Sequence, residues 1–264
     1  MSEKILVLES DSSIYTLLEN ALRAKGFDIL DIKEPAEALR RIQSERPALA
    51  LIDIRLPKTL NGFEICRMIT NVERLATEVL LISSTSVEEA ERLKAYESGA
   101  IGFYETPLGL RTLADDISAF LSKPEPYLPL VSLAGALNVS AAPKVVVIDD
   151  DEDQLKAVAM NLQEQAFVPH IARSARRGIM LVHKLKPSAV ILDVGLPDFS
   201  GVFALKALKS HTRTHPIPVY MWTGSEREGQ ELTSLNRGAD EYLIKGAHDV
   251  SALPLRIKRR LGLS

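Results

Sequence analysis

Short apolar runs alternate with longer amphipathic stretches along this chain of 264 residues. The runs are rich in Val, Ile and Leu and show no strict alternation of apolar and polar positions, which is typical of strands covered on both faces. Between the runs, apolar residues recur at helical spacing. The first such group predicts one buried stripe, formed by Leu17, Leu18, Ala21 and Leu22. Strand and helix alternate five times in this way, which predicts an α/β fold with a parallel sheet and helices on both faces.

The whole pattern then occurs a second time. Residues 5–11 resemble 145–151, 48–53 resemble 188–193, 79–84 resemble 219–224, and 99–106 resemble 238–245. The offset is 140 (145 − 5) for the first three pairs and 139 (238 − 99) for the last. A repeat of this length is much larger than a solenoid unit and indicates a duplicated domain. We therefore expect one domain at 1–123 and a second at 144–264.

Residues 124–143 form the expected connector. Its prolines exclude one continuous helix; they are Pro124, Pro126, Pro129 and Pro143. Its apolar residues argue against a simple flexible linker. Two interpretations remain open, a semi-rigid spacer laid on one domain or a short helix from about Leu130 to Leu137 that sets the interdomain angle. We favour the spacer.

Composition narrows the class of protein. No apolar run approaches the length of a membrane span, and Cys66 is the one cysteine, so an intrachain disulfide and a cysteine metal cluster are excluded. We expect a cytoplasmic protein. Residues 1–124 carry 15 basic and 20 acidic side chains (net −5), whereas 144–264 carry 17 and 14 (net +3). The halves therefore present different surfaces, and neither is basic enough to imply nucleic-acid binding.

Acidic residues stand at the ends of two predicted strands in the second copy. Asp149 and Asp150 follow the first strand and Asp193 follows the third. In the strand order 2-1-3-4-5 these strands are neighbours, so the three carboxylates converge where ligands bind in such sheets. Like charges this close resist ionising together, and a hard divalent cation such as Mg²⁺ removes the conflict. Thr223 and Lys245, at the ends of the fourth and fifth strands, add a hydroxyl and a cation.

This constellation resembles the receiver domain of response regulators, the CheY-like family of two-component signalling. The matching residues are Asp149, Asp150, Asp193 with Leu196, Pro197 and Gly201, Thr223, Tyr242 and Lys245. The resemblance covers essentially all of 144–264 and implies a flavodoxin-like (βα)5 doubly wound sheet.

The resemblance also implies the chemistry. Asp193 would accept a phosphoryl group from a sensor histidine kinase or phosphotransfer protein. Mg²⁺ would be held by Asp150, Asp193 and the Gly195 carbonyl, with Asp149 assisting through water. Lys245 and Thr223 would contact the phosphoryl oxygens. Thr223 and Tyr242 would then switch, which would change the surface formed by the fourth and fifth helices.

The first copy resembles the same family over about residues 3–122, but its site is degenerate. Asp53 remains, whereas the acidic pair has become Glu9 and Ser10, with Asp11 one place later. The corresponding positions for threonine, aromatic residue and lysine hold Ser83, Phe103 and Thr106. Arg55 could bring a cation near Asp53. We favour a pseudo-receiver that serves as a docking or dimerising module over a weak phosphoacceptor.

One departure affects the second copy. The family usually has a cis proline after the lysine, and here Gly246 follows Lys245. A non-proline cis bond is costly, so the sequence leaves open whether the bond after Lys245 is cis or trans, and with it the position of the lysine.

The predicted function is a tandem-receiver response regulator without a separate output domain. Its enzymatic activity would be limited to its own phosphorylation and dephosphorylation, and it would signal to a downstream protein target. A haloacid-dehalogenase-type hydrolase is the main alternative, with Asp149 as nucleophile and Asp151 as acid. An unphosphorylated scaffold is the other.

Overall fold

The computed structural model describes residues 3–57, 60–71, 76–130, 133, 135, 137–224 and 238–263. The chain divides into two compact units, Met1–Lys123 and Pro124–Ser264. Within the described ranges, no helix is both long enough and apolar enough to cross a lipid bilayer.

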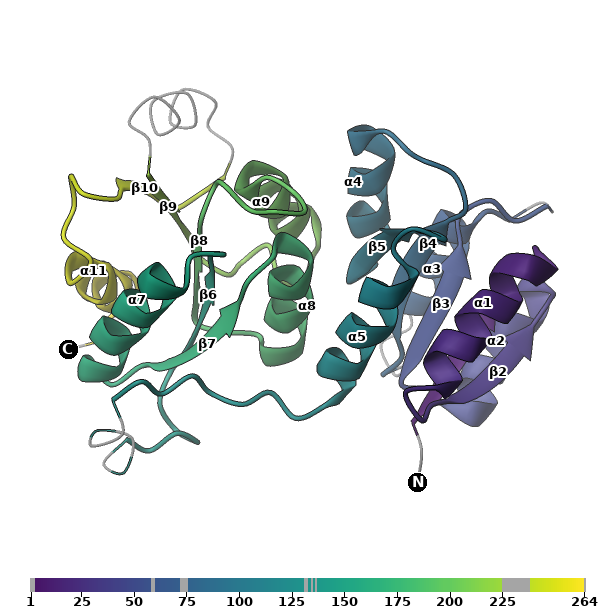
Figure 1. Ribbon diagram of the computed structural model, residues 1–264, viewed down its shortest axis with the longest axis horizontal. Coiled ribbons are helices and arrows are strands. Elements are labelled where there is room, and N and C mark those ends of the chain that lie inside the picture. The colour runs from purple at the N-terminus through teal and green to yellow at the C-terminus, as the bar shows by residue number, and fades with distance from the viewer. Residues whose placement is uncertain are drawn as a thin grey trace. The chain divides into compact units, whose positions relative to one another are not determined.

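The first unit alternates strands and helices without interruption (Figure 1). Its elements are β1 (Lys4–Leu8), α1 (Ser12–Arg23), β2 (Asp28–Ile32), α2 (Pro35–Glu45), β3 (Leu49–Asp53), α3 (Gly62–Thr70), β4 (Glu78–Ser83), α4 (Glu89–Glu97), β5 (Gly102–Glu105) and α5 (Leu110–Leu121). The five strands are parallel in the order β2-β1-β3-β4-β5. Helix α1 packs beside α5, whereas α2, α3 and α4 bury side chains in one core on the other face.

The second unit has the same arrangement. Its elements are β6 (Lys144–Ile148), α7 (Glu152–Glu164), β7 (Val168–Ala172), α8 (Ala175–Leu185), β8 (Ala189–Leu192), α9 (Gly201–Ser210), β9 (Val219–Thr223), β10 (Glu241–Ile244) and α11 (Ala252–Leu261). The parallel order β7-β6-β8-β9-β10 equals 2-1-3-4-5, so the predicted fold is confirmed in both copies. Residues 225–237, where the fourth helix of this copy is expected, lie outside the described residues.

Burial explains the uninterrupted apolar runs. Every residue of the central strands β3 and β8 is buried, because helices cover both faces of the sheet. One helical prediction is wrong in part. Leu18 and Leu22 are buried in α1, but Leu17 is 44% exposed. Positions 18 and 22 lie one turn apart on the face toward the sheet, and Leu17 lies about 100° away from Leu18 around the helix.

The connector is attached to the second unit by its backbone. The Tyr127 N–H donates to the Pro169 carbonyl at 2.8 Å, and the Leu130 N–H donates to Gln163 Oε1 at 2.9 Å. Gln163, buried in α7, donates back to the Leu130 carbonyl. This attachment agrees with a spacer laid on one domain. Residues 131, 132, 134 and 136 of the proposed short helix lie outside the described residues.

Candidate functional site

Two adjacent strands of the second unit bring three carboxylates together. Asp149 follows β6 and Asp193 follows β8, and these strands pair directly, with Ile148 opposite Leu192. The Asp193 N–H donates to the Ile148 carbonyl at 2.8 Å. As a result, carboxylate oxygens of Asp149, Asp150 and Asp193 lie within 4.8 Å of one another. Asp149 and Asp193 are buried, whereas Asp150 is exposed and open to a ligand.

Lys245 reaches both buried carboxylates. Its Nζ lies 2.8 Å from Asp149 Oδ2 and 2.7 Å from Asp193 Oδ1. Burial opposes the charged ammonium, but the hydrogen bonds to the two aspartates outweigh it and raise the pKa of Lys245. Burial also raises the pKa of Asp149, against the hydrogen bond from Lys245. The lysine therefore stays charged and neutralises part of an acidic cluster.

Backbone N–H groups orient the two buried carboxylates. The Asp151 N–H donates to Asp149 Oδ1 and the Gly195 N–H donates to Asp193 Oδ2, both at 3.0 Å. Asp151 itself caps α7 by accepting from two backbone N–H groups. Its carboxylate is therefore engaged in helix capping, and the hydrolase alternative would need it as an acid.

The carboxylate cluster of the second unit fits a hard divalent cation. The formal charge of three carboxylates and one ammonium is −2, since −3 + 1 = −2. Carboxylate oxygens are the donors that Mg²⁺ prefers, and three of them stand close enough to share one ion. Because Lys245 already holds Asp149 and Asp193, the exposed Asp150 is the least constrained of the three.

Thr223 and Tyr242 occupy the neighbouring strand ends. Thr223 is fully buried at the end of β9, and its carbonyl accepts the Lys245 N–H at 2.7 Å. Tyr242 is half-buried in β10 opposite Met221. The Lys245–Gly246 bond, which the sequence left open, is trans, and the lysine reaches both carboxylates.

The first unit places Glu9 and Asp53 together without a lysine. Both carboxyls are buried, at 0% and 3% exposure. Glu9 Oε1 accepts the Asp11 N–H at 2.8 Å and Asp53 Oδ1 accepts the Arg55 N–H at 3.0 Å. Burial raises the pKa of Glu9 to about 7, and the nearby Asp53 charge adds to this effect. Burial also raises the pKa of Asp53.

The other residues of the first site point elsewhere. Asp11 is exposed and caps α1, and Ser10 is also exposed. Thr106 is buried, and its Oγ1 donates to the Ser83 carbonyl at 3.3 Å, so it cannot supply the positive charge that Lys245 supplies in the second copy. Phe103 is buried in the core. The first unit therefore keeps an aspartate, Asp53, at the position of Asp193 but no lysine at the position of Lys245.

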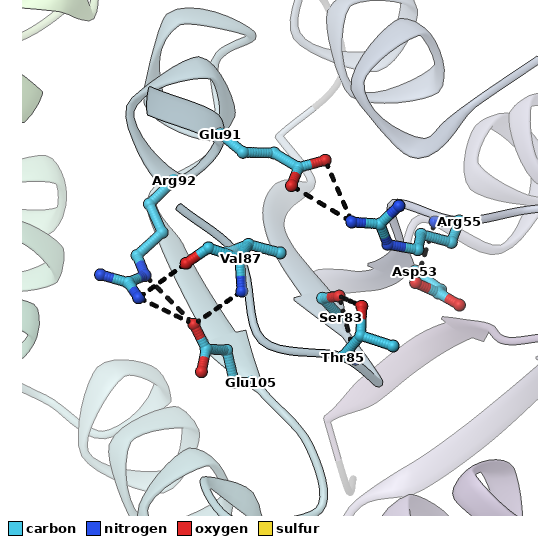
Figure 2. Close-up of polar contacts among 8 residues, drawn as sticks. All are labelled: Asp53, Arg55, Ser83, Thr85, Val87, Glu91, Arg92 and Glu105. Carbon is cyan, nitrogen blue, oxygen red and sulfur yellow. Dashed lines mark hydrogen bonds and ion pairs between the residues drawn. The ribbon is translucent and has the colours of Figure 1, made fainter. Parts of the chain in front are cut away.

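A polar network holds α4 beside this degenerate site (Figure 2). The Arg55 guanidinium pairs with Glu91 at 3.2 Å, so the expected cation is directed toward α4. The next residue, Arg92, pairs with Glu105 at the end of β5 and donates to the Val87 carbonyl at 2.8 Å. Sequence reasoning missed these pairs because they join residues far apart in the chain.

The chain belongs to the response regulator receiver family. The model of the response regulator receiver domain matches it twice, at residues 5–118 and 145–257. Both copies found in the sequence are therefore receiver domains of two-component systems.

Individual relatives agree with this assignment. The chain is 31% identical over 129 residues to the alkaline phosphatase synthesis transcriptional regulatory protein PhoP of Bacillus subtilis, which covers 49% of this chain and 52% of that protein. It is 23% identical over 285 aligned positions to the response regulator PleD of Caulobacter vibrioides, covering 99% of this chain and 59% of that protein. The chain thus spans about half the length of the curated relatives it matches.

A solved structure is similar as well. The CheY-like receiver domain protein from Methanospirillum hungatei JF-1 is 26% identical, with a TM-score of 0.41, covering 46% of this chain and 95% of that one.

Proposed function

We propose that the second unit accepts a phosphoryl group on Asp193 from a phosphohistidine of a sensor kinase or phosphotransfer protein. The observation that carries the proposal is the placement of Asp193, 2.7 Å from the Lys245 ammonium and within 4.8 Å of two more carboxylates. Phosphoryl transfer depends mainly on positioning and on neutralising the phosphoryl oxygens, and this arrangement serves both.

In the transfer step, a carboxylate oxygen of Asp193 forms a bond to phosphorus. The bond between phosphorus and the donor nitrogen breaks, and the imidazole leaves with the electron pair and takes up a proton. Mg²⁺, held by Asp150 and Asp193 with help from the Gly195 carbonyl and Asp149, would neutralise phosphoryl oxygens. Lys245 exchanges its bond to Asp193 for one to a phosphoryl oxygen, and the Thr223 hydroxyl donates to another.

The activity of the unit is limited to its own aspartate. In dephosphorylation by hydrolysis, a water oxygen forms a bond to phosphorus, the bond between phosphorus and Asp193 breaks with Asp193 leaving as the carboxylate, and the water proton passes to solvent. The phosphorylated form then differs from the free form at Thr223 and Tyr242. Any downstream protein that binds one form better shifts this equilibrium.

The first unit serves as a docking module for a protein partner or for a second copy of the chain. Its Glu9 and Asp53 lack the lysine that would neutralise a phosphoryl group, and Thr106 is hydrogen bonded to Ser83. Arg55 and Arg92 hold α4 through their ion pairs with Glu91 and Glu105, so α4 keeps its position without phosphorylation.

Labelling with a small phosphodonor in the presence of Mg²⁺ tests the assignment. The full chain and the variants Asp193→Asn, Asp53→Asn and Asp149→Asn are incubated, and the hydroxylamine-sensitive acyl phosphate is mapped by mass spectrometry. We expect label on Asp193, unchanged in Asp53→Asn and absent in Asp193→Asn.

Three other outcomes contradict parts of the proposal. Label that survives Asp193→Asn and disappears in Asp149→Asn favours the hydrolase. Label on Asp53 contradicts the role given to the first unit. Absence of label in every protein favours a scaffold.

A further inference from the structure

The turn that follows Lys245 has its own system of hydrogen bonds. The lysine must leave β10 and point back toward Asp149 and Asp193, so a small change in this turn would move its ammonium. The His248 N–H donates to the Ile244 carbonyl at 2.9 Å and closes the turn. The His248 ring lies over the strand end, with Nδ1 3.1 Å from the Ile244 nitrogen and 3.3 Å from the Ile244 oxygen. A backbone bridge also joins His248 to Lys245.

The first unit shows the same turn stabilised in a different way. There the Gly109 N–H donates to the Glu105 carbonyl at 2.8 Å, and Pro107 lies within the turn. A Cβ atom on Gly109 would lie 2.8 Å from the Glu105 oxygen, so this position has no room for a side chain. The proline and the glycine of the first turn thus correspond to a glycine and a histidine in the second.

Gly246 makes the second turn intrinsically less constrained. Its φ is +85°, and nothing lies within 4 Å of where a Cβ would stand. Glycine allows this conformation but loses more backbone entropy on folding than other residues. Without the proline ring, the side-chain bond of His248 to Ile244 is the added constraint next to Lys245.

We propose that His248 is a positioning residue that holds the β10 turn so that Lys245 reaches Asp149 and Asp193. This inference rests on the proposed function, because the role of the lysine in phosphoryl transfer is part of that proposal. His248 acts through the backbone of Ile244 and touches neither the acceptor nor its donor. The five histidines of the sequence show no metal-ligand spacing, so spacing alone does not single out His248. The sequence signal that identifies His248 is a difference between the two copies. Pro107 and Gly109 of the first turn correspond to Gly246 and His248 of the second.

The test is the rate of Asp193 labelling in the full chain with a small phosphodonor and Mg²⁺. His248→Ala should slow labelling about three- to tenfold, the effect expected from losing one hydrogen bond. His248→Asn should stay near the wild-type rate, because its amide places an acceptor close to the position of Nδ1. His248→Gln should resemble His248→Ala, because its acceptor lies one bond farther out. His215→Ala, at an exposed histidine after α9, is the matched control and should label normally.

A double-mutant cycle shows whether His248 acts through the lysine. In a Lys245→Met background, His248→Ala should cause no further loss. A wild-type rate for His248→Ala, failure of His248→Asn to restore the rate, or an equal loss in the Lys245→Met background would each overturn the inference. These outcomes differ from failure of the proposed function, in which the wild-type chain itself would carry no label on Asp193. Urea unfolding followed by Trp222 fluorescence checks that each variant is folded.

Discussion

The buried pair of Glu9 and Asp53 leads to a prediction of unusual sign, namely that removing a charge from the first unit stabilises it. In Glu9→Gln the amide oxygen still accepts the Asp11 N–H, which lies 2.8 Å from Glu9 Oε1. The new NH2 group replaces Oε2, which is buried and has no donor among the described residues. The charge of Asp53 helps to raise the pKa of Glu9, and the neutral amide removes this repulsion.

The magnitude follows from the pKa of Glu9, which rises from 4.5 to about 7 on folding. Each pKa unit corresponds to about 1.4 kcal/mol, so the ionised carboxyl costs the fold about 3 kcal/mol at pH 8. Because folding raises the pKa of Glu9, the unfolding free energy that it contributes decreases as pH rises. The contribution of Glu9 to stability is fully present below pH 4.5 and is lost as pH rises through about 7. The gain from Glu9→Gln should therefore be largest at pH 8 and fall below about 1 kcal/mol at pH 5.

The assay uses urea unfolding of the full chain with two probes. Far-UV circular dichroism reports on both units, whereas Trp222, the one tryptophan of the chain, lies in β9 and reports on the second unit. A gain of about 3 kcal/mol corresponds to a midpoint shift of about 1 to 2 M urea for a domain of this size. We expect the shift in the circular dichroism transition of the first unit and none in the fluorescence transition.

Glu97→Gln is the control, because it removes the same charge from an exposed position on α4. Surface changes of this kind usually alter stability by less than about 0.5 kcal/mol. The reasoning is refuted if Glu9→Gln unfolds at the same or lower urea concentration than the wild type at pH 8, or if its gain is as large at pH 5.

Three further predictions concern the second unit. Lys245→Met should lower the unfolding free energy of the second unit by about 2 to 3 kcal/mol without Mg²⁺, because two buried carboxylates lose their partner. Added Mg²⁺ should stabilise this variant more than it stabilises the wild type, as measured by Trp222 fluorescence in urea. Burial lowers the pKa of His183 well below 6.5, so the contribution of His183 to stability is present above pH 6.5 and is lost as pH falls. His183→Leu should make the unfolding free energy depend less on pH in the acid range, in the same assay. An unchanged dependence of the unfolding free energy on pH would contradict this prediction. Gly201→Ala would place a Cβ 1.9 Å from the Asp193 carbonyl oxygen, so both the unfolding free energy (by about 1 to 3 kcal/mol) and the labelling rate of Asp193 should fall.

Much of the fold was readable from the sequence because it depends on local patterns. Strands covered on both faces need uninterrupted apolar runs, and the central strands β3 and β8 are buried throughout. The duplication placed Asp149 and Asp193 at the ends of strands that a parallel sheet must bring together. The predicted burial of Leu17 was wrong, because packing decides which side of a helix faces the core.

The pairing of charges required the tertiary structure. Glu9 and Asp53 are 44 positions apart (53 − 9), and the sequence shows neither their burial nor the way it raises the pKa of both carboxyls. Arg55 stands two residues past Asp53, yet its guanidinium pairs with Glu91 because the fold brings α4 within reach.

By itself, the sequence determined the duplication and the loss of the lysine in the first copy, because each is written in residue types at fixed spacing. The strand order was implied by the resemblance to the receiver family and is confirmed by the structure. Only the tertiary structure decided how Lys245 reaches its two aspartates from a turn without proline. The structure shows the Ile244 N–H donating to His248 Nδ1 at 3.1 Å, the contact that we propose positions the lysine, and its geometry arises only when the chain has folded.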